Sequence, residues 1–212
     1  MARCLALVAA AGWVVLFSSV LGVRSVEVSG AALLSADQVR AAAGIRPGAP
    51  LARLDTRAIA ARVEKVPAVR QAAVELSYPS TVRIRVAERV AVGFQRGDDG
   101  GPVLVDQAGT PFRAVDQPPA GLPELIVAAP DALRAAAPVS AALPPELLSQ
   151  VASIGADSVN AVTLSLVDGR TVRWGAAAGA AADAAKAGLL VAVLGQPGSS
   201  FDISAAGIVV IR

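Results

Sequence analysis

An uncharged apolar run near the N-terminus constrains this chain more than any other feature. It extends from Cys4 to Gly22, reads CLALVAAAGWVVLFSSVLG, and is flanked by Arg3 and Arg24. As an α-helix its 19 residues reach about 28 Å, close to the roughly 30 Å hydrocarbon core of a bilayer. The run therefore predicts a short leader and a transmembrane helix within residues 1–22.

The alternative to an anchor is a cleaved signal peptide. The apolar region of a signal peptide is normally about 7–15 residues, shorter than this run, and Val20-Leu21-Gly22 is only an imperfect cleavage pattern. Arg3 and Arg24 nearly balance, so the positive-inside rule gives little information on orientation. A short leader before a long globular region favours an N-terminus inside the cell, with the bulk of the chain outside the cytoplasmic membrane.

The remaining composition argues against catalysis and against nucleic-acid binding. The net charge is only +2, aromatic residues make up 3% of the chain, and the arginines are scattered rather than gathered on a basic face. The chain has no His, and its one cysteine, Cys4, excludes an intrachain disulfide and a cysteine-based metal site. We therefore expect no cofactor and no metal, and we expect that the protein is not an enzyme.

Two local patterns are candidates for chemistry. Asp98-Asp99 lies in a Gly-rich turn, where solvated charge is the simpler interpretation. A Ser–Lys dyad would need Lys65 or Lys186, and each is expected on the polar surface of an amphipathic helix. Trp174 is expected to pack in a β-domain core rather than to bind a ligand.

Residues 23–90 follow the order strand, helix, helix, strand, strand. Val26 and Val28 alternate with polar residues, which indicates a half-buried strand. Ser35 with Gln38 forms a capping box that starts a helix ending at Gly44, and Asp55 caps a second helix that ends before Pro67. The segments 69–77 and 82–86 then alternate on either side of a turn at 78–81, which predicts a hairpin.

This unit resembles a POTRA domain. The resemblance is carried by Val26–Gly30, Leu54-Asp55, Val66–Val69, Ser77–Thr81 and Val86–Arg89. A single POTRA domain directly after an N-terminal anchor is similar to the FtsQ/DivIB family of bacterial cell division proteins. That family implies a second, β-rich domain, here residues 91–212, and Val103–Phe112 and Leu122–Leu125 are also similar to it.

The pattern of residues 91–212 independently indicates mixed structure rich in strands. Hairpin signals lie near Gly109 and at Asp168-Gly169, and Ala180 to Leu194 has helical periodicity. The Ala/Pro-rich stretch 128–142 predicts short helix and loop, and a helix is expected from Pro144 to about Val151. The fold class is therefore α+β, with a transmembrane helix, a POTRA domain and a β-rich domain that contains two or so helices.

The C-terminus is the strongest candidate for a binding site. Ile208–Ile211 is four consecutive β-branched residues, which strongly favours a strand. If this strand lies at a sheet edge, its unpaired N–H and C=O groups can bind a partner strand. The alternative is that it is a central or covered strand, and the residues alone do not decide between the two.

The family resemblance implies partners for this edge. In the family the last strand pairs with FtsB (DivIC), which comes with FtsL; here the corresponding positions are Ser204, Ala205, Gly207, Ile208, Val209, Val210 and Ile211. The hairpin tip Pro79, Ser80 and Thr81 matches a second family contact region. These similarities imply a divisome scaffold that helps to assemble septal peptidoglycan synthesis. The alternative is an envelope POTRA module that handles unfolded client strands.

Overall fold

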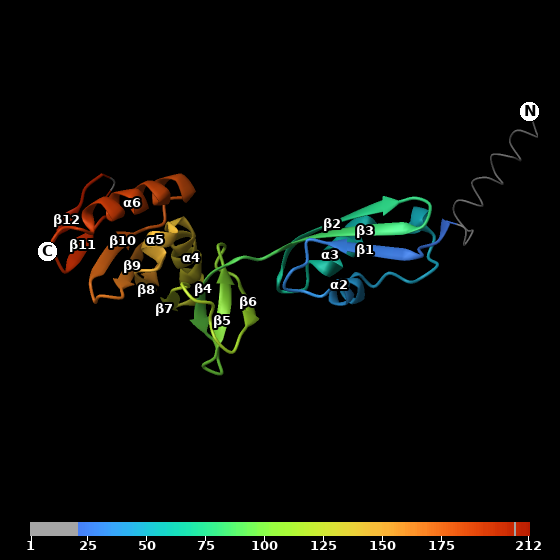
Figure 1. Cartoon of the computed structure of the whole chain (residues 1–212), viewed down its shortest axis with the longest axis horizontal. Helices are drawn as coiled ribbons and strands as arrows, with labels where there is room; N and C mark the ends of the chain where they lie inside the picture. Colours follow the sequence, from blue (N-terminus) through green and yellow to red (C-terminus); the bar gives the residue numbers. More distant parts are fainter. Residues whose placement is uncertain (1–20, 206) are drawn as a thin grey trace, which may run out of the picture. The chain divides into compact units, whose positions relative to one another are not determined.

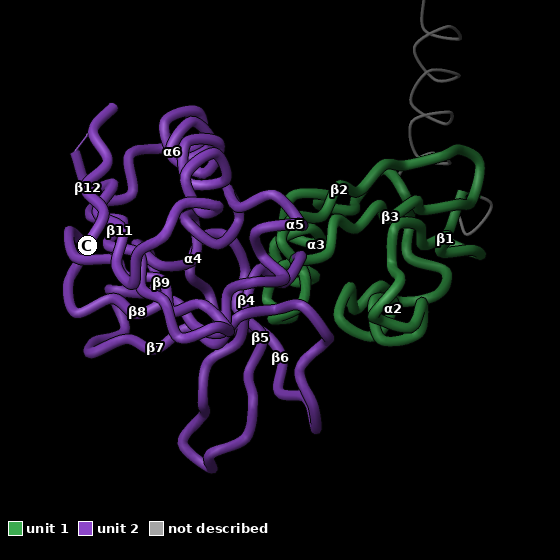
Figure 2. Tube along the Cα trace, turned by 60° about the vertical axis from the view of Figure 1, so that its left-hand side comes forward, with its two compact units in different colours: residues 1–89 green, residues 90–212 purple. Residues whose placement is uncertain are grey.

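The computed structural model describes residues 21–205 and 207–212, so the predicted transmembrane helix lies almost entirely outside the described residues. Within those ranges, no helix combines the length and the apolarity that a membrane crossing requires. The chain divides into two compact units, residues 1–89 and residues 90–212, coloured green and purple in Figure 2. Each unit has its own hydrophobic core.

The first unit has the predicted strand, helix, helix, strand, strand order (Figure 1). Its elements are β1 (Ser25–Ser29), α2 (Ala36–Ala43), the 3-10 turn η2 (Leu51–Arg53), α3 (Thr56–Val63), β2 (Val69–Ser77) and β3 (Thr81–Glu88). β3 is the central strand, parallel to β1 and antiparallel to β2. Its inward residues Val82, Ile84 and Val86 are buried, while Arg83 and Arg85 lie on the exposed face.

Both helices of this unit begin at the residues that the sequence indicates, and α2 also ends at the predicted Gly44, whereas α3 ends at Val63, before Pro67. Ser35 accepts a bond from the Gln38 N–H, and the Gln38 side chain accepts one from the Ser35 N–H, so the predicted capping box is present. Gly44 ends α2 in the left-handed conformation with φ 59°. The Asp55 side chain caps α3 by accepting from the Ala58 N–H. The two helices bury Val39, Ala43, Ile59 and Val63 against the sheet, which closes the core.

The second unit is built on one nine-stranded mixed sheet (Figure 1), in the order β12-β11-β10-β9-β8-β7-β4-β5-β6. Its strands are β4 (Ala91–Arg96), β5 (Pro102–Asp106), β6 (Pro111–Ala114), β7 (Glu124–Val127), β8 (Val151–Ser158), β9 (Ala161–Leu166), β10 (Thr171–Gly175), β11 (Ser200–Asp202) and β12 (Val210–Ile211). Its helices are η3 (Pro130–Ala132), α4 (Leu133–Ala142), α5 (Pro145–Leu148) and α6 (Ala180–Val193).

Two segments of this unit differ from the expectation. The stretch 128–142 forms η3 and a buried helix, α4, which packs on β4, β7 and β8 because its alanines allow close approach to the sheet. The helix after Pro144 ends at Leu148, so its predicted extension to Val151 was wrong. Val151 instead starts β8, a central strand between β7 and β9 that the pattern did not predict. Register shifts and the small residues Gly155 and Ala156 weaken its alternation.

A buried polar cluster joins α6 to the sheet. Trp174 is fully buried at the end of β10, as predicted, and its Nε1–H donates to Asp183 Oδ1 at 3.2 Å. The Ala178 N–H donates to both Asp183 oxygens at 3.1 Å, so this fully buried carboxylate is satisfied by groups from two directions. Lys186 Nζ donates to the carbonyls of Trp174 and Ala176 at 3.0 and 3.2 Å. The cluster therefore sets the height and direction of α6 over the sheet.

We predict that Asp183→Ala destabilises the second unit by about 2–4 kcal/mol, because it leaves the buried Trp174 indole N–H and the Ala178 N–H without their acceptor. The measurement is denaturant unfolding of the full chain in detergent, followed by tryptophan fluorescence. Asp157→Ala, which removes an exposed carboxylate of the same unit, is the matched control. Equal unfolding midpoints for the two variants would contradict the structural role of Asp183.

Candidate functional site

The C-terminal strand β12 is the last strand of the nine-stranded sheet. It pairs antiparallel with β11, with Phe201 opposite Ile211 and Asp202 opposite Val210. β11 in turn pairs parallel with β10. Because β12 stands at the end of the strand order, its side away from β11 has no neighbouring strand among the described residues. This side of β12 is called the open edge below.

The hydrogen-bond register shows which backbone groups face the open edge. Ser200 and Arg212 exchange both of their bonds: the Arg212 N–H donates to the Ser200 carbonyl at 2.9 Å, and the Ser200 N–H donates to the Arg212 carbonyl at 3.0 Å. In an antiparallel ladder such pairs alternate with pairs that do not bond to each other. Ile211, opposite Phe201, belongs to the second kind, so its N–H and C=O point away from β11 toward the open edge.

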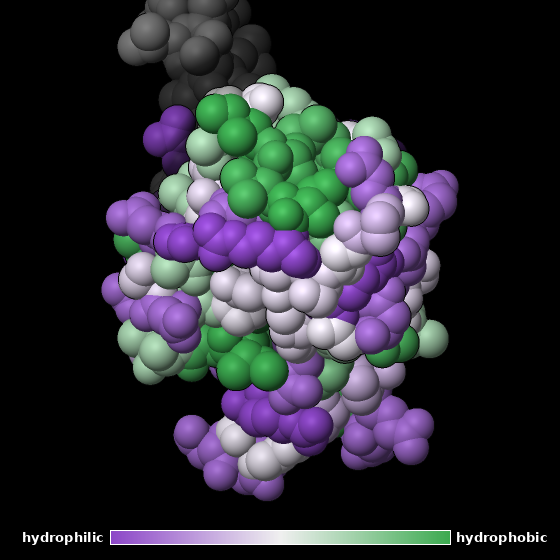
Figure 3. Space-filling view, turned by 90° about the vertical axis from the view of Figure 1, so that its left-hand side faces the viewer, coloured by the Kyte–Doolittle hydropathy of each residue, from purple (hydrophilic) through white to green (hydrophobic). Residues whose placement is uncertain are grey.

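The side chains of the last residues separate into two faces. Ile208 and Val210 are 59% and 43% exposed. Val209 and Ile211 are half-buried and pack against the core of the unit. Figure 3 looks onto this end of the unit and shows apolar surface gathered there. The open edge therefore combines unpaired backbone groups with apolar side chains on both of its faces.

Only part of the predicted strand forms a ladder. The expected strand covered Ile208 to Ile211, whereas β12 contains only Val210 and Ile211. The reason lies in the partner strand, since β11 ends at Asp202 and the chain turns there. The Asp202 carboxylate accepts from the Ser204 N–H at 2.9 Å and from the Ser204 hydroxyl at 2.6 Å. Beyond this turn β11 offers nothing for Ile208 and Val209 to pair with.

The other predicted C-terminal site residues lie in the connection between the two strands. Ser204 and Ala205 belong to the exposed turn after β11, and Gly207 has a φ of 72°, a left-handed conformation that favours glycine. The Ile208 N–H donates to the Ala205 carbonyl at 3.3 Å. The structure therefore brings the seven predicted residues into one segment, but only its last part offers a strand edge.

Arg170 supports this region and was not singled out from the sequence. Its guanidinium lies 5.6 Å from the centre of the Phe201 ring. It donates to the Leu194 carbonyl at 2.7 Å and to Asp168 Oδ2 at 2.6 Å, and so links the end of α6 to the β9–β10 turn. The Arg170 N–H holds the pKa of the Asp168 carboxyl below its ordinary value. The sequence indicates the turn at Asp168-Gly169, but no local pattern indicates that Arg170 contacts Phe201 and the end of α6.

The second predicted contact region, Pro79 to Thr81, belongs to the first unit. It forms the tip of the β2–β3 hairpin, as predicted, and the Tyr78–Pro79 peptide bond is cis. The Ser80 carbonyl accepts from the N–H groups of Arg24 and Ser25 at 2.8 and 3.2 Å. The tip is therefore tied to the start of β1.

The candidates for chemistry occupy ordinary structural positions. Asp98 and Asp99 are exposed in the β4–β5 turn, where Asp99 accepts from the Gly101 N–H. Lys65 is exposed, whereas Lys186 is half-buried, so the expectation of a surface position was wrong for Lys186. Its ammonium donates to the backbone carbonyls of Trp174 and Ala176. Within residues 21–205 and 207–212 no group of His, Cys, Asp or Glu side chains is arranged to hold a metal ion.

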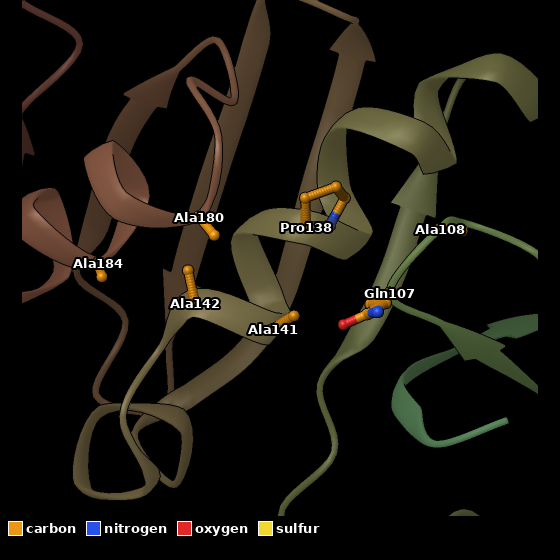
Figure 4. A pocket seen from close by; sticks show the side chains of 7 residues that line it. All are labelled: Gln107, Ala108, Pro138, Ala141, Ala142, Ala180 and Ala184. Carbon is orange, nitrogen blue, oxygen red and sulfur yellow. The ribbon is translucent and has the colours of Figure 1, made fainter. Parts of the chain in front are cut away.

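A hollow of the second unit also lacks reactive groups. It has a volume of about 590 Å³ and lies between α4, α6 and the β5–β6 turn (Figure 4). Its lining consists of Gln107, Ala108, Pro138, Ala141, Ala142, Ala180 and Ala184. No acid, base or nucleophile is among these residues, so the hollow offers packing surface rather than a catalytic site.

The turn after β11 predicts a pH dependence. The hydroxyl and the N–H of Ser204 both donate to the Asp202 carboxylate and hold its pKa below the ordinary value of 3.8. The ionised form is thus favoured in the folded chain, so this stabilisation is complete above pH 3.8 and is lost as the pH falls through the lowered pKa. We expect the stability difference between the wild type and Asp202→Asn to be constant at neutral pH and to shrink on acidification. A difference that stays constant into the acid range would contradict this assignment.

Two family models match the chain. Residues 21–89 match the POTRA domain of FtsQ type, and residues 93–208 match the C-terminal region of the cell division proteins FtsQ/DivIB. The second match ends two residues before β12. Together the matches cover both compact units.

Curated relatives agree with these matches. Cell division protein FtsQ of Mycolicibacterium smegmatis is 41% identical over 93% of this chain and 59% of its own length. The FtsQ protein of Mycobacteroides abscessus is 40% identical over 91% of this chain and 62% of its own length. The FtsQ protein of Streptomyces venezuelae is 34% identical over 95% of this chain and 78% of its own length. The chain thus spans about three fifths of the length of the two mycobacterial relatives.

A solved structure of the extracytoplasmic domain of DivIB from Geobacillus stearothermophilus aligns with 52% of this chain and 98% of its own, at 16% identity and a TM-score of 0.37. This likeness is too distant to carry an argument about the fold. The family matches and the relatives decide the assignment. The chain belongs to the FtsQ/DivIB family of bacterial cell division proteins.

Proposed function

We propose that this protein is a membrane-anchored, non-enzymatic scaffold of the divisome that binds FtsB/DivIC-like and FtsL-like proteins through the open edge of β12. In this proposal the apolar run 4–22 anchors the chain in the cytoplasmic membrane with its N-terminus inside. Both units then lie outside that membrane, at the division septum, where the complex helps to assemble and regulate the septal peptidoglycan synthase. Family membership and the position of β12 support the proposal.

The single observation that carries the binding mode is the orientation of the Ile211 backbone. Its N–H and C=O point away from β11, so an incoming strand can form the next ladder of the sheet without disturbing the existing one. Main-chain bonds need little side-chain specificity, so selectivity must come from the two faces of the edge. Val209 and Ile211 continue the core on one face, and Ile208 and Val210 offer apolar contact on the other.

The structure identifies Val210 as the position for a test. Val210 is 43% exposed, so a lysine there remains solvated in the free chain, whereas Val209 packs against the core and a charge there would also affect folding. We expect Val210→Lys to weaken capture of the FtsB/FtsL pair by at least about tenfold, which corresponds to about 1.4 kcal/mol. The measurement is a pull-down of the pair by the full chain in detergent.

The matched control is Val159→Lys, which charges another exposed valine of the same unit, 49% exposed and in the β8–β9 turn. Thermal unfolding of both variants should match the wild type. If Val210→Lys captured the FtsB/FtsL pair as well as the control variant does, the proposed binding mode would be contradicted. Loss of capture by both variants would mean that charge anywhere on this unit disturbs the complex, which also contradicts an edge-specific contact.

A cellular experiment separates the divisome role from the alternative of an envelope POTRA module for client strands. Depletion of the protein should give filamentous or branched cells with unfinished septa, and Val210→Lys should fail to restore division. Normal septa together with defective secretion would favour the alternative.

A further inference from the structure

The chain enters the first unit without a linker. Gly22, the last residue of the apolar run, already forms a β-bridge with Pro50. It lies so close to the 46–50 turn that a Cβ on Gly22 would stand 2.7 Å from the Gly48 carbonyl oxygen. Val23 is buried, donates its N–H to the Ala49 carbonyl at 2.9 Å and accepts from the Gly48 N–H at 2.8 Å. The folded unit therefore begins where the apolar run ends.

Two further segments lie at this same end of the unit. The 46–50 turn is held there by the bonds to Val23. The β2–β3 hairpin tip is held there by the Ser80 carbonyl, which accepts from the N–H groups of Arg24 and Ser25. We call the residues 22–24, 46–50 and 78–80 the entry rim. The chain leaves the unit from the far end of β3, which runs parallel to β1 away from the rim.

The chemistry of the entry rim is that of a membrane–water interface. Arg24 and Arg46 are exposed, and neither makes an ion pair with a described residue. Tyr78, the one tyrosine of the chain, is 57% exposed at the hairpin tip. The three rim segments contain no acidic residue. Cations attract anionic headgroups, and tyrosine side chains favour the headgroup level of a bilayer.

We propose that the entry rim binds the headgroups of anionic phospholipids at the outer face of the membrane. This inference rests on the proposed anchor. If residues 4–22 span the bilayer, the absence of a linker leaves the rim at the depth of the headgroups. Arg24 and Arg46 then bind lipid phosphates, Tyr78 lies among the headgroups, and the first unit is held at a fixed height and tilt rather than swinging on a tether.

The test compares two labelled positions in the full chain, each in a Cys4→Ala background so that only one thiol reacts. The rim position is Tyr78→Cys, and the control is Leu33→Cys, which is 49% exposed and lies at the far end of the unit beside Glu88. Each variant carries an environment-sensitive fluorophore and is incorporated into nanodiscs. One set contains phosphatidylcholine alone and the other also contains phosphatidylglycerol, and both sets carry the same headgroup-linked quencher.

We expect the label at position 78 to be quenched and its emission to be blue-shifted, both more strongly with phosphatidylglycerol. The label at position 33 should remain unquenched, with the emission of a label in water. The double change Arg24→Gln and Arg46→Gln should remove the phosphatidylglycerol effect. Arg70→Gln, a change at an exposed arginine at the start of β2 at the far end, should keep it.

The outcomes separate this proposal from the proposed function. If the chain enters nanodiscs but the label at position 78 is as unquenched and as solvent-exposed as the label at position 33, the rim contact is contradicted and the proposed anchor is not. A quenched label that ignores both phosphatidylglycerol and the arginine variants also overturns the rim contact, because anionic headgroups then do not bind it. A chain that fails to enter nanodiscs overturns both the rim contact and the anchor.

Discussion

The pairing of backbone groups across β11 and β12 is the constraint on which the functional account depends. Each inner strand of the nine-stranded sheet has a neighbouring strand on both sides to which its N–H and C=O groups can bond. β12 has only β11, and the exchange of bonds between Ser200 and Arg212 fixes which of its groups are used. The Ile211 groups that remain are therefore oriented by the fold itself toward the open edge, where the proposed partner strand would bind.

The surroundings of β12 keep this short strand in place. A ladder of two residues is weak by itself, yet Ile211 and Val209 pack on the core, and Ile211 contacts Gly198 so closely that a Cβ there would stand 2.3 Å from its Cγ2. Arg170 holds the end of α6 beside Phe201, and Asp183 holds the start of the same helix over Trp174. The edge is therefore supported by a buried polar cluster and an arginine that lie outside the C-terminal segment.

Much of this arrangement could be predicted from local patterns. Ser35, Gly44 and Asp55 act within one turn of their own helix, so the first unit was predicted almost element by element. β8 escaped prediction, and the stretch that forms α4 was predicted only as short helix and loop, because burial by distant segments, rather than local periodicity, makes them strand and helix. The C-terminal residues were identified as a candidate, but the turn at Asp202 that shortens β12 depends on a side-chain bond to Ser204 that the sequence pattern does not reveal.

Amide hydrogen exchange resolved to single residues tests the central claim most directly. In the free chain, the account predicts slow exchange at the N–H groups of Ser200 and Arg212, which bond across the β11–β12 ladder, and fast exchange at Ile211. With the FtsB/FtsL pair bound, the Ile211 N–H should become protected while the other two keep their protection. An Ile211 amide that is already slow in the free chain, or that stays fast in the complex, would contradict the account.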